Sequence, residues 1–469
     1  YTGTIIFRNG GISSGQVNGV VLNGDTNAAI NGNIEIGNVT NIDNTFDVVV
    51  ALGASEQIVN TASITFRGAS GENAYFKLMG FTETVAGISG TTNEGVIENV
   101  ENSEAGVSTN GRLIVDSSDD YSYTGYIRNR GTGTNPTLLE FEKRGSGTQT
   151  LVGSRVTYTG DTTITGGTLR LTDTTGFASN IINNSSLLLN SSGTWTLGTT
   201  ISGTGALTKA GIGSVALGGA NSYSGPTLIE QGMVSIIASS CLGDGSATNT
   251  IRLANGAVLQ STGASVDLGV NRSITLAGTG GALEVTGSNS LTVPGALFGD
   301  ACHVLTKSGT GLLVLTNTTN ATSFAGGSTA VSAGILQVGL AGVGSTGSGP
   351  TTVAGGAVLA GTGSVAGSLS VASGGVLHTG DVTLAGDAIT TTSGIGTLNV
   401  AGNAILAAGS TAYFTLDSPA SSDLLNVGGN LTLAGNLWVT GSFVPAIGQT
   451  FNLIDWAGLA DFSSFNVGL

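Results

Sequence analysis

The chain has 469 residues, which would ordinarily mean two to four domains. However, 78 of them, about 17%, are glycine, where about 7% is typical, and only 9% are charged, where about 25% is typical. A hydrophobic fraction of 40% excludes disorder, and six prolines exclude a collagen-like or Pro-rich chain. The scarcity of Glu, Lys and Arg argues against helices, and a net charge of −15 argues against a nucleic-acid partner and against docking to anionic lipid.

Residues 1–130 are more polar than the rest, and we expect a β region that continues without a break into residues 131–395. Short apolar runs between Asn and Gly turns predict strands at 3–7, 34–36, 48–50 and 64–66. The one candidate for a helical turn is 51–60. The first residue is tyrosine and no basic, apolar leader precedes it, so we expect any export signal to have been removed or not included.

Residues 131–395 contain three copies of one pattern, at 141–171, 207–236 and 305–338. Each copy has an alternating segment with a lysine and two glycines, then an aromatic residue with a glycine two positions later, and closes on Gly-x-apolar-x-apolar. The shared positions are Lys143, Gly145, Gly147, Tyr158, Gly160; Lys209, Gly211, Gly213, Tyr223, Gly225; and Lys307, Gly309, Gly311, Phe324, Gly326. The third copy has a longer loop before its aromatic residue.

This pattern has a physical interpretation. Alternation with period two turns one set of side chains inward and the other outward. Paired glycines allow a bend, or a close approach to a neighbouring backbone. The lysine recurs at one position, which favours a structural role, and we expect its stem to lie over the coil with the amine in water.

Residues 396–469 continue as short strands and are expected to form the last rungs and a cap. Short strands every eight to twelve residues over more than 300 residues favour a solenoid over a sandwich or barrel. We therefore predict an all-β fold, an elongated β-solenoid similar to a parallel β-helix, with few or no helices and about 20–25 residues a coil. No apolar run approaches the ~18 residues of a membrane-spanning helix, so no transmembrane segment is expected.

The three copies resemble the autotransporter-associated β-strand repeat of exported bacterial surface proteins. The stretches at 113–127 and 396–456 are similar to the rungs that flank such repeats, so the resemblance covers about residues 110–465. It implies a passenger-type β-solenoid that is exported to the cell surface or the extracellular space. It implies little about what such a protein binds.

Catalytic groups are scarce in this chain. Only His303 and His378 could act as imidazole bases. The Gly-x-Ser-x-Gly run at 11–15 lacks the helix that a nucleophile elbow requires, and we attribute it to the abundance of glycine. The glycine pairs at 203–205 and 211–213 lack the setting of a phosphate loop and are expected to form turns. We predict no cofactor, no metal site and no enzymatic activity.

The best candidate for carbohydrate chemistry is an acidic corner made of Asp116, Asp119 and Asp120. Clustered carboxylates with cations nearby are what acid–base or Ca²⁺ chemistry on a polysaccharide needs. The cations close in sequence are Arg112, Arg128, Arg130 and Lys143, and Glu140 and Glu142 share a strand face. The simpler interpretation, which we favour, is a solvated strand face and a charged turn.

Three smaller features could bind a ligand or form a cross-link, but each also has a simpler interpretation. Asp43 and Asp47 could hold a cation, but the Gly-rich repeat of calcium-binding β-rolls is absent. Cys241 and Cys302 could form a disulfide in an oxidising compartment, which their spacing does not decide. Trp438 and Trp456 could stack on sugar, but their place among the last apolar rungs favours a capping role.

The function that these observations favour is mechanical or adhesive: a surface stalk, fibre or matrix component. Because the ends of a solenoid expose unpaired strand edges, and no Lys or Arg follows Lys307, copies of the chain could join end to end into filaments. One alternative is a glycan-binding adhesin that acts through the charged N-terminal third, with surface glycans or other matrix proteins as partners. The other is a polysaccharide lyase or hydrolase that uses Asp119 and Asp120.

Overall fold

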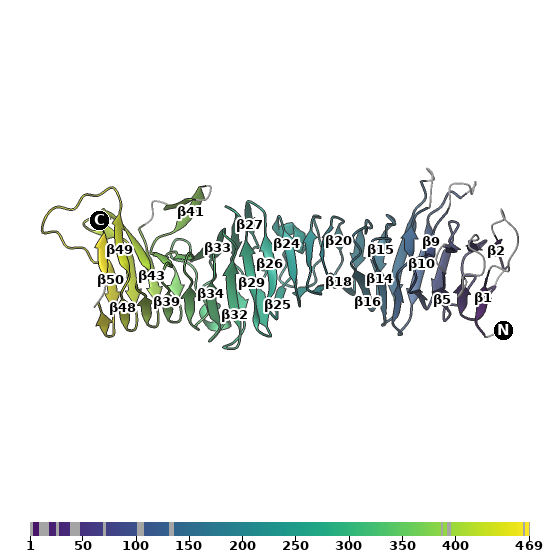
Figure 1. The fold of residues 1–469 in the computed structure, drawn as a ribbon, viewed down its shortest axis with the longest axis horizontal. Helices are drawn as coiled ribbons and strands as arrows, with labels where there is room; N and C mark the ends of the chain where they lie inside the picture. Colours follow the sequence, from purple (N-terminus) through teal and green to yellow (C-terminus); the bar gives the residue numbers. More distant parts are fainter. Residues whose placement is uncertain are drawn as a thin grey trace. The chain divides into compact units, whose positions relative to one another are not determined.

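The computed structural model describes residues 3–8, 18–24, 28–37, 47–68, 72–100, 107–130, 136–385, 388–391, 395–462 and 465–468. The chain divides into two compact units, Tyr1–Gly225 and Pro226–Leu469. In each unit, parallel strands from successive coils lie side by side in continuous sheets (Figure 1). The prediction of an all-β, parallel β-solenoid is confirmed. The region boundaries predicted at 130 and 395 stay predictions.

The first unit contains five runs of hydrogen-bonded strands. They are, in sheet order, β1 (Ile5–Phe7), β3 (Ile34–Ile36), β5 (Ser63–Phe66) and β8 (Gly87–Ser89); β2 (Asn18–Leu22), β4 (Val48–Leu52), β6 (Ala74–Lys77), β9 (Gly95–Glu98) and β12 (Tyr126–Arg128); β7 (Thr82–Val85), β10 (Gly111–Asp116), β13 (Leu139–Arg144), β15 (Thr162–Ile164), β17 (Ile181–Asn183) and β20 (Ile201–Ser202); β11 (Tyr121–Tyr123), β14 (Thr148–Val152), β16 (Thr168–Thr172), β18 (Ser186–Asn190) and β21 (Ala206–Ala210); and β19 (Thr194–Leu197) with β22 (Ser214–Leu217).

The second unit contains four parallel runs. They are β23 (Thr227–Ile229), β25 (Ile251–Ala254), β28 (Ile274–Ala277) and β31 (Leu297–Phe298); β24 (Met233–Ile236), β26 (Ala257–Ser261), β29 (Gly280–Val285), β32 (Val304–Ser308), β34 (Ser328–Val331), β36 (Thr351–Val353), β39 (Leu369–Val371), β44 (Ala404–Leu406), β48 (Leu431–Leu433) and β51 (Ala460–Asp461); β27 (Ser265–Asp267), β30 (Ser290–Val293), β33 (Leu312–Leu315), β35 (Ile335–Val338), β37 (Val358–Ala360), β40 (Val376–His378), β45 (Thr411–Ser418), β49 (Asn436–Thr440) and β52 (Asn466–Gly468); and β38 (Ser364–Val365), β43 (Thr397–Val400), β47 (Leu424–Val427) and β50 (Ile454–Trp456).

Two named pairings depart from the parallel pattern. The hairpin β41 (Val382–Ala385) and β42 (Ala388–Thr391) is antiparallel, and β46 (Ser421–Ser422) pairs antiparallel with β45. The hairpin covers the outward face of β33, β35, β37 and β40, where Val382 and the partly buried Leu384 pack on a second apolar cluster. These strands are therefore buried on both faces, which explains their continuous apolar runs.

Two single helical turns complete the fold. They are the 3-10 turn η1 (Ser239–Leu242) and the α-helical turn α1 (Asn320–Ser323), which is the longer loop of the third repeat copy. The turn predicted at 51–60 is wrong. Ala51 and Leu52 are paired in β4, and Ile58 is fully buried in a bridge to Ile30. The segment therefore pairs with a neighbouring coil at both ends and does not form a helical turn.

Inward side chains at equivalent register positions form columns along each interior. One column of the first unit runs through Leu151, Leu171 and Leu189 and ends on Lys209, all of them buried. Each added coil therefore extends the same apolar interior and the same hydrogen-bond ladder. Apolar burial is the main favourable term for such a stack.

The coils are less uniform than predicted. Leu169 pairs with Leu187, 18 residues later, whereas Asn18 pairs with Val48, 30 residues later. The longest step of the second unit joins Leu369 to Ala404, 35 residues later, because the β41–β42 hairpin is inserted between them. The expected 20–25 residues a coil holds for steps such as Phe141 to Thr162 and Leu312 to Ile335 in the repeat copies. It fails at the shorter step from Leu169, at the end of the first copy, and where loops are inserted.

The repeat glycines lie where the backbone of one coil touches the next. At Gly213 an added Cβ would lie 2.1 Å from the carbonyl oxygen of Gly193, one coil earlier. Gly309 has φ +71°, and a Cβ there would lie 2.3 Å from the carbonyl oxygen of Val285. A side chain at either position would therefore force two coils apart.

We expect Gly213→Ala to lower the free energy of unfolding by about 1–3 kcal/mol, the usual cost of overpacking. The matched control is Gly198→Ala, because nothing lies within 4 Å of a Cβ at that position. The control should be neutral or slightly stabilising, since alanine restricts the unfolded chain. Urea denaturation of both variants measures the difference, and equal midpoints would contradict this account of the repeat.

Candidate functional site

The three repeat lysines point into the solenoid interior. Lys209 and Lys307 are 0% exposed and Lys143 is 2% exposed. The expectation of a stem over the coil with the amine in water is therefore wrong. Each lysine lies two positions after an inward apolar residue of the same strand, so the alternation of the strand turns it inward as well.

The Lys307 ammonium closes the end of its strand. Its Nζ donates to the carbonyl oxygens of Ser308 at 2.8 Å, Gly309 at 2.7 Å and Ala333 at 3.0 Å. An ammonium has three donors, and all three are used. Two acceptors belong to the turn that follows the lysine and the third to the next coil, so the side chain joins two coils at a corner.

The other two lysines repeat this arrangement. They donate to the carbonyls of the two residues that follow them: Lys209 to Ala210 and Gly211, both at 2.7 Å, and Lys143 to Arg144 and to Gly145. The glycines matter here because their positive φ turns the carbonyls toward the ammonium. Gly145, Gly211 and Gly309 have φ +62°, +75° and +71°.

Burial changes the proton affinity of these amines. It lowers the pKa of Lys307 to about 8, although the charge of Glu284 opposes the shift. It lowers the pKa of Lys209 to about 8 against the charge of Asp173. Both amines sit among carbonyls of the turn, where no substrate can reach them, so we assign them to the structure and not to chemistry.

The acidic corner at the end of β10 is a hydrogen-bonded turn. Asp116, Asp119 and Asp120 are exposed. Asp120 Oδ1 accepts from the Thr148 backbone N–H of the next coil at 2.7 Å, and the Asp119 N–H donates to Ser117 Oγ at 3.0 Å. The corner therefore supports the stacking of two coils.

Two of the arginines predicted beside this corner, Arg112 and Arg128, are paired with other acids. Arg112 and Arg144 both bind the carboxylate of Glu142, and Arg128 Nε lies 2.9 Å from Glu98 Oε2. Burial alone would raise the pKa of Glu142, but the hydrogen bond from Arg144 and the two positive charges lower it. The Arg112–Glu142 and Arg128–Glu98 pairs join strands of adjacent coils, whereas Arg144 and Glu142 lie on the same strand, β13. Arg112 and Arg128 are thus paired with acids away from the acidic corner.

Glu140 is bonded to a residue of the preceding coil. Glu140 Oε1 accepts from Asn110 Nδ2 at 3.0 Å, and Arg130 is half-buried after β12. Asp47 Oδ1 accepts from the backbone N–H and from Nδ2 of Asn73. Asp43 and the Gly-x-Ser-x-Gly run at 11–15 lie outside the described residues. Within the described ranges, no group of three His, Cys, Asp or Glu could hold a metal ion.

Several buried polar side chains, which the sequence did not indicate, replace backbone partners at irregular corners. Glu83 accepts from the N–H groups of Gln57 at 2.8 Å and Ile58 at 2.9 Å, and burial raises its pKa to about 7 despite these bonds. Asp423 accepts from the N–H groups of Gly396 and Thr415 in the same way. Such residues satisfy peptide groups where the ladder is interrupted.

Arg272 is another fully buried polar residue that sequence analysis missed. It holds the irregular segment between β24 and β25: its guanidinium donates to Asn249 Oδ1 at 2.8 and 3.1 Å, to Ser239 Oγ at 2.7 Å and to the carbonyl of Leu268 at 2.9 Å. Its only sequence signal is an isolated cation in a half of the chain with very few of them.

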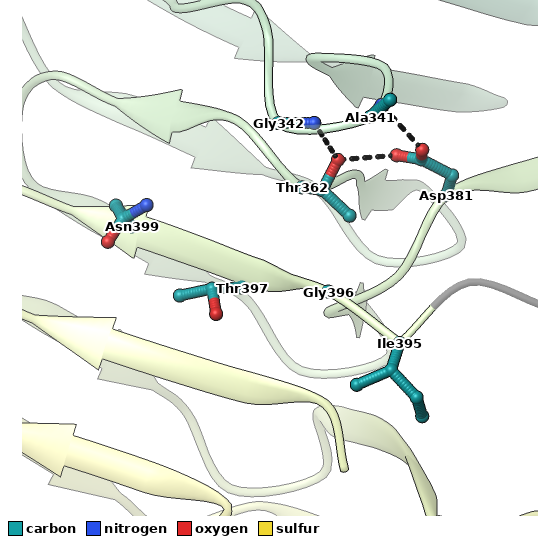
Figure 2. Close-up of a pocket in the computed structure, with 8 residues that line it drawn as sticks. All are labelled: Ala341, Gly342, Thr362, Asp381, Ile395, Gly396, Thr397 and Asn399. Carbon is teal, nitrogen blue, oxygen red and sulfur yellow. Dashed lines mark hydrogen bonds between the residues drawn. The ribbon is translucent and has the colours of Figure 1, made fainter. Parts of the chain in front are cut away.

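A groove of about 650 Å³ opens beside β43 in the second unit (Figure 2). Asp381 Oδ2 accepts from the Ala341 N–H at 2.8 Å, Asp381 Oδ1 accepts from Thr362 Oγ1 at 2.9 Å, and Thr362 Oγ1 accepts from the Gly342 N–H at 2.8 Å. Ala341 has φ +52° and Gly342 φ +84°, so this carboxylate fixes a tight turn. Both oxygens of Asp381 are engaged, which leaves the groove without a free acid.

The two histidines are also engaged locally. His303 Nδ1 accepts from the Asp300 N–H at 3.0 Å. His378 is buried and stacks on Tyr413 at 5.5 Å; burial lowers its pKa, which the charge of Asp423 opposes. Neither imidazole is aligned with a nucleophile in the described part of the chain.

The remaining residues named in the sequence analysis are two cysteines and two tryptophans. Cys241 is buried and Cys302 is exposed, and no disulfide joins them. Trp438 on β49 and Trp456 on β50 are 43% and 42% exposed. Their capping role stays a prediction. The described residues include no helix that is both long and apolar enough to span a bilayer.

The fold and the repeat together define a class, the passenger-type β-solenoid. Residues 141–171, 207–236 and 305–338 match the passenger-associated-transport-repeat family, and these are the three copies found in the sequence. The chain therefore carries three passenger-associated transport repeats, and the resemblance to autotransporter passengers is confirmed. The repeat supports an exported surface protein.

One similar protein carries a functional name, that of an adhesin. Over 98 residues, the chain is 44% identical to the adhesin BmaC autotransporter of Brucella suis biovar 1 (strain 1330). The matched stretch covers 21% of this chain and 3% of that adhesin. The chain thus spans a small fraction of the relative's length.

We expect Lys307→Met to lower the free energy of unfolding by about 1–3 kcal/mol at pH 7, because methionine keeps the length of the side chain but leaves carbonyls of two coils without their donor. Urea denaturation measures the loss. The folded-state pKa of about 8 lies below the ordinary 10.5, so between these values the unfolded state binds more protons and this lysine adds stability as pH rises.

The stability difference between the native chain and Lys307→Met should therefore grow from pH 8 to pH 10. The other lysines are the same in both proteins and cancel in the comparison. A difference that shrinks over this range would mean that the carbonyls stabilise the ammonium more than burial destabilises it.

Proposed function

We propose that this chain is a surface-exposed stretch of an exported adhesive passenger, a stalk, fibre or matrix component that carries binding surfaces away from the cell. The observation that carries the proposal is the presence of three passenger repeats within a β-solenoid, together with the match to a protein named an adhesin. We further propose an extracellular or cell-surface location for the region.

The physical construction supports a mechanical role. Each coil contacts mainly its neighbours through parallel ladders and interior columns, so a solenoid can be lengthened without redesign of its core. Polar contacts between coils add to this: the Lys307 ammonium bonds to the Ala333 carbonyl of the next coil, and Arg112 pairs with Glu142, which also binds Arg144. Outward positions are mostly Ser, Thr and Asn, which present many hydrogen-bonding groups to a ligand or to water.

Glycan binding is the second candidate, and surface glycans or other matrix proteins are its partners. The acidic corner is a weak basis for it, because Asp120 is engaged with Thr148 of the next coil. The same contact argues against a lyase or hydrolase that uses Asp119 and Asp120 together, because it occupies Asp120.

We also propose that copies of the chain associate end to end. The outermost strands of parallel ladders carry unpaired peptide groups. Pairing of the first strand of one copy with the last strand of another is a heterologous contact that can propagate. No Lys or Arg after Lys307 guards such an edge. In the first unit, β2 is outermost in its sheet among the described strands, and Val21 on it is 63% exposed.

The adhesive role is tested by display of the chain on a non-adherent laboratory bacterium through a heterologous translocator. Retention on cultured cells and on extracellular matrix should rise several-fold, because a dense array of weak sites binds with avidity. The control is the same translocator with an unrelated β-solenoid of equal length. Retention no greater than that of the control would refute an adhesive role.

End-to-end association is tested by sedimentation velocity and electron microscopy over a range of concentrations. The native chain should form longer particles as concentration rises, and Val21→Lys should abolish this because a lysine on an edge strand opposes pairing. Ile212→Lys is the matched control, since Ile212 is 82% exposed on a turn. Discrete single particles at every concentration would refute the proposal.

A further inference from the structure

A second, smaller hollow lies at one corner of the first unit. Its volume is about 400 Å³, at the lower end of the ~300–1,000 Å³ range of small-molecule sites. Corner segments of three coils line it: Thr91 and Asn93 before β9, Thr124 between β11 and β12, and Val152 at the end of β14 with Gly153, Ser154 and Arg155 after it. The surface is therefore assembled by stacking.

Arg155 is the only charged residue among those lining the hollow. Its guanidinium lies 4.9 Å from the ring centroid of Tyr126 on β12. No hydrogen bond or ion pair joins its side chain to any other described residue, in contrast to Arg128, which is paired with Glu98. A guanidinium held against an aromatic ring with its donors unused is prepared to bind an anion.

The other polar groups of the hollow suit a polyol. Thr91, Asn93 and Ser154 are exposed, and Thr124 Oγ1 donates to the carbonyl of Gly90 at 3.0 Å, so its lone pairs remain acceptors. Hydroxyl and amide groups around a single cation match a ring that carries several hydroxyls and one carboxylate. Val152 is the one aliphatic side chain among the lining residues, so a flat aromatic or long apolar ligand would find little apolar surface here.

We propose that this corner binds the carboxylate of an acidic sugar, a uronic or sialic acid residue, with Arg155 as the anion partner and the surrounding hydroxyl and amide groups on the ring hydroxyls. The proposal deepens the adhesive function proposed above and rests on it for its biological meaning. Because the whole chain carries a net charge of −15, general attraction cannot select such a ligand. The bidentate contact to one guanidinium must do so.

The test is calorimetric titration of the full chain with oligosaccharides that contain glucuronic or sialic acid, against the same oligosaccharides with the carboxyl groups reduced. Reduction should weaken binding by about tenfold or more, because a charge-assisted hydrogen bond is lost. Arg155→Met should weaken binding of the acidic form equally. Ser154→Tyr, which fills the hollow and leaves Arg155 in place, should also abolish binding.

Arg170→Met is the matched control, since Arg170 is a half-buried arginine on β16 of the same unit that does not line the hollow. It should bind like the native chain, and circular dichroism should show all variants folded. Equal binding of the reduced oligosaccharide, equal binding by Arg155→Met, or no binding of any carboxylated oligosaccharide would overturn the proposal. Binding of a sulfated, carboxyl-free oligosaccharide in preference to the acidic sugars would overturn the ligand class.

The adhesion assay separates this site from the proposed function. If displayed Arg155→Met still adheres, adhesion uses another surface. If the acidic sugar binds the purified chain while the displayed chain does not adhere, the site stands and the adhesive function fails.

Discussion

The parallel hydrogen-bond ladder between successive coils is the constraint on which the rest of this structure depends. Each coil must present its peptide groups at the same height as those of the coil beside it, so inward side chains fall into columns such as Leu151, Leu171 and Leu189. The ladder also sets how close two turns come. At Gly213 that distance leaves no room for a Cβ, so only glycine fits at this position of the repeat.

Corners are where the ladder is interrupted, and there the chain uses buried polar side chains. The Lys307 ammonium serves three carbonyls, Asp423 serves two N–H groups, and Arg272 serves a whole irregular segment. A buried charge is tolerable only when hydrogen bonds satisfy it. The composition of 9% charged residues therefore understates their importance, because a good part of this small set sits inside the solenoid or between coils.

Much of the fold could be predicted because alternation is a local property. The strands at 34–36, 48–50 and 64–66 and the three repeat copies follow from period-two patterns and from turn residues. The failures have a common cause, which is dependence on a neighbouring coil. Lys307 was expected at the surface because its acceptors, among them the carbonyl of Ala333 in the next coil, are not apparent from the strand that carries it. Arg112 was named among the cations close in sequence to the acidic corner, whereas stacking brings it to Glu142, 30 residues away.

The same dependence decides which polar surfaces can bind a ligand. Asp381 lines the larger groove, but the adjoining turn uses both of its oxygens, so the groove is held in shape by the group that would otherwise recognise a ligand. Arg155 lines the smaller hollow, and the neighbouring coil supplies only the Tyr126 ring, which orients the guanidinium without using its donors. In a solenoid most polar side chains are used by the coils on either side. A binding residue is therefore recognised by polar groups that stacking leaves unsatisfied. Arg155 meets that criterion, whereas Asp120 of the acidic corner is used by the next coil.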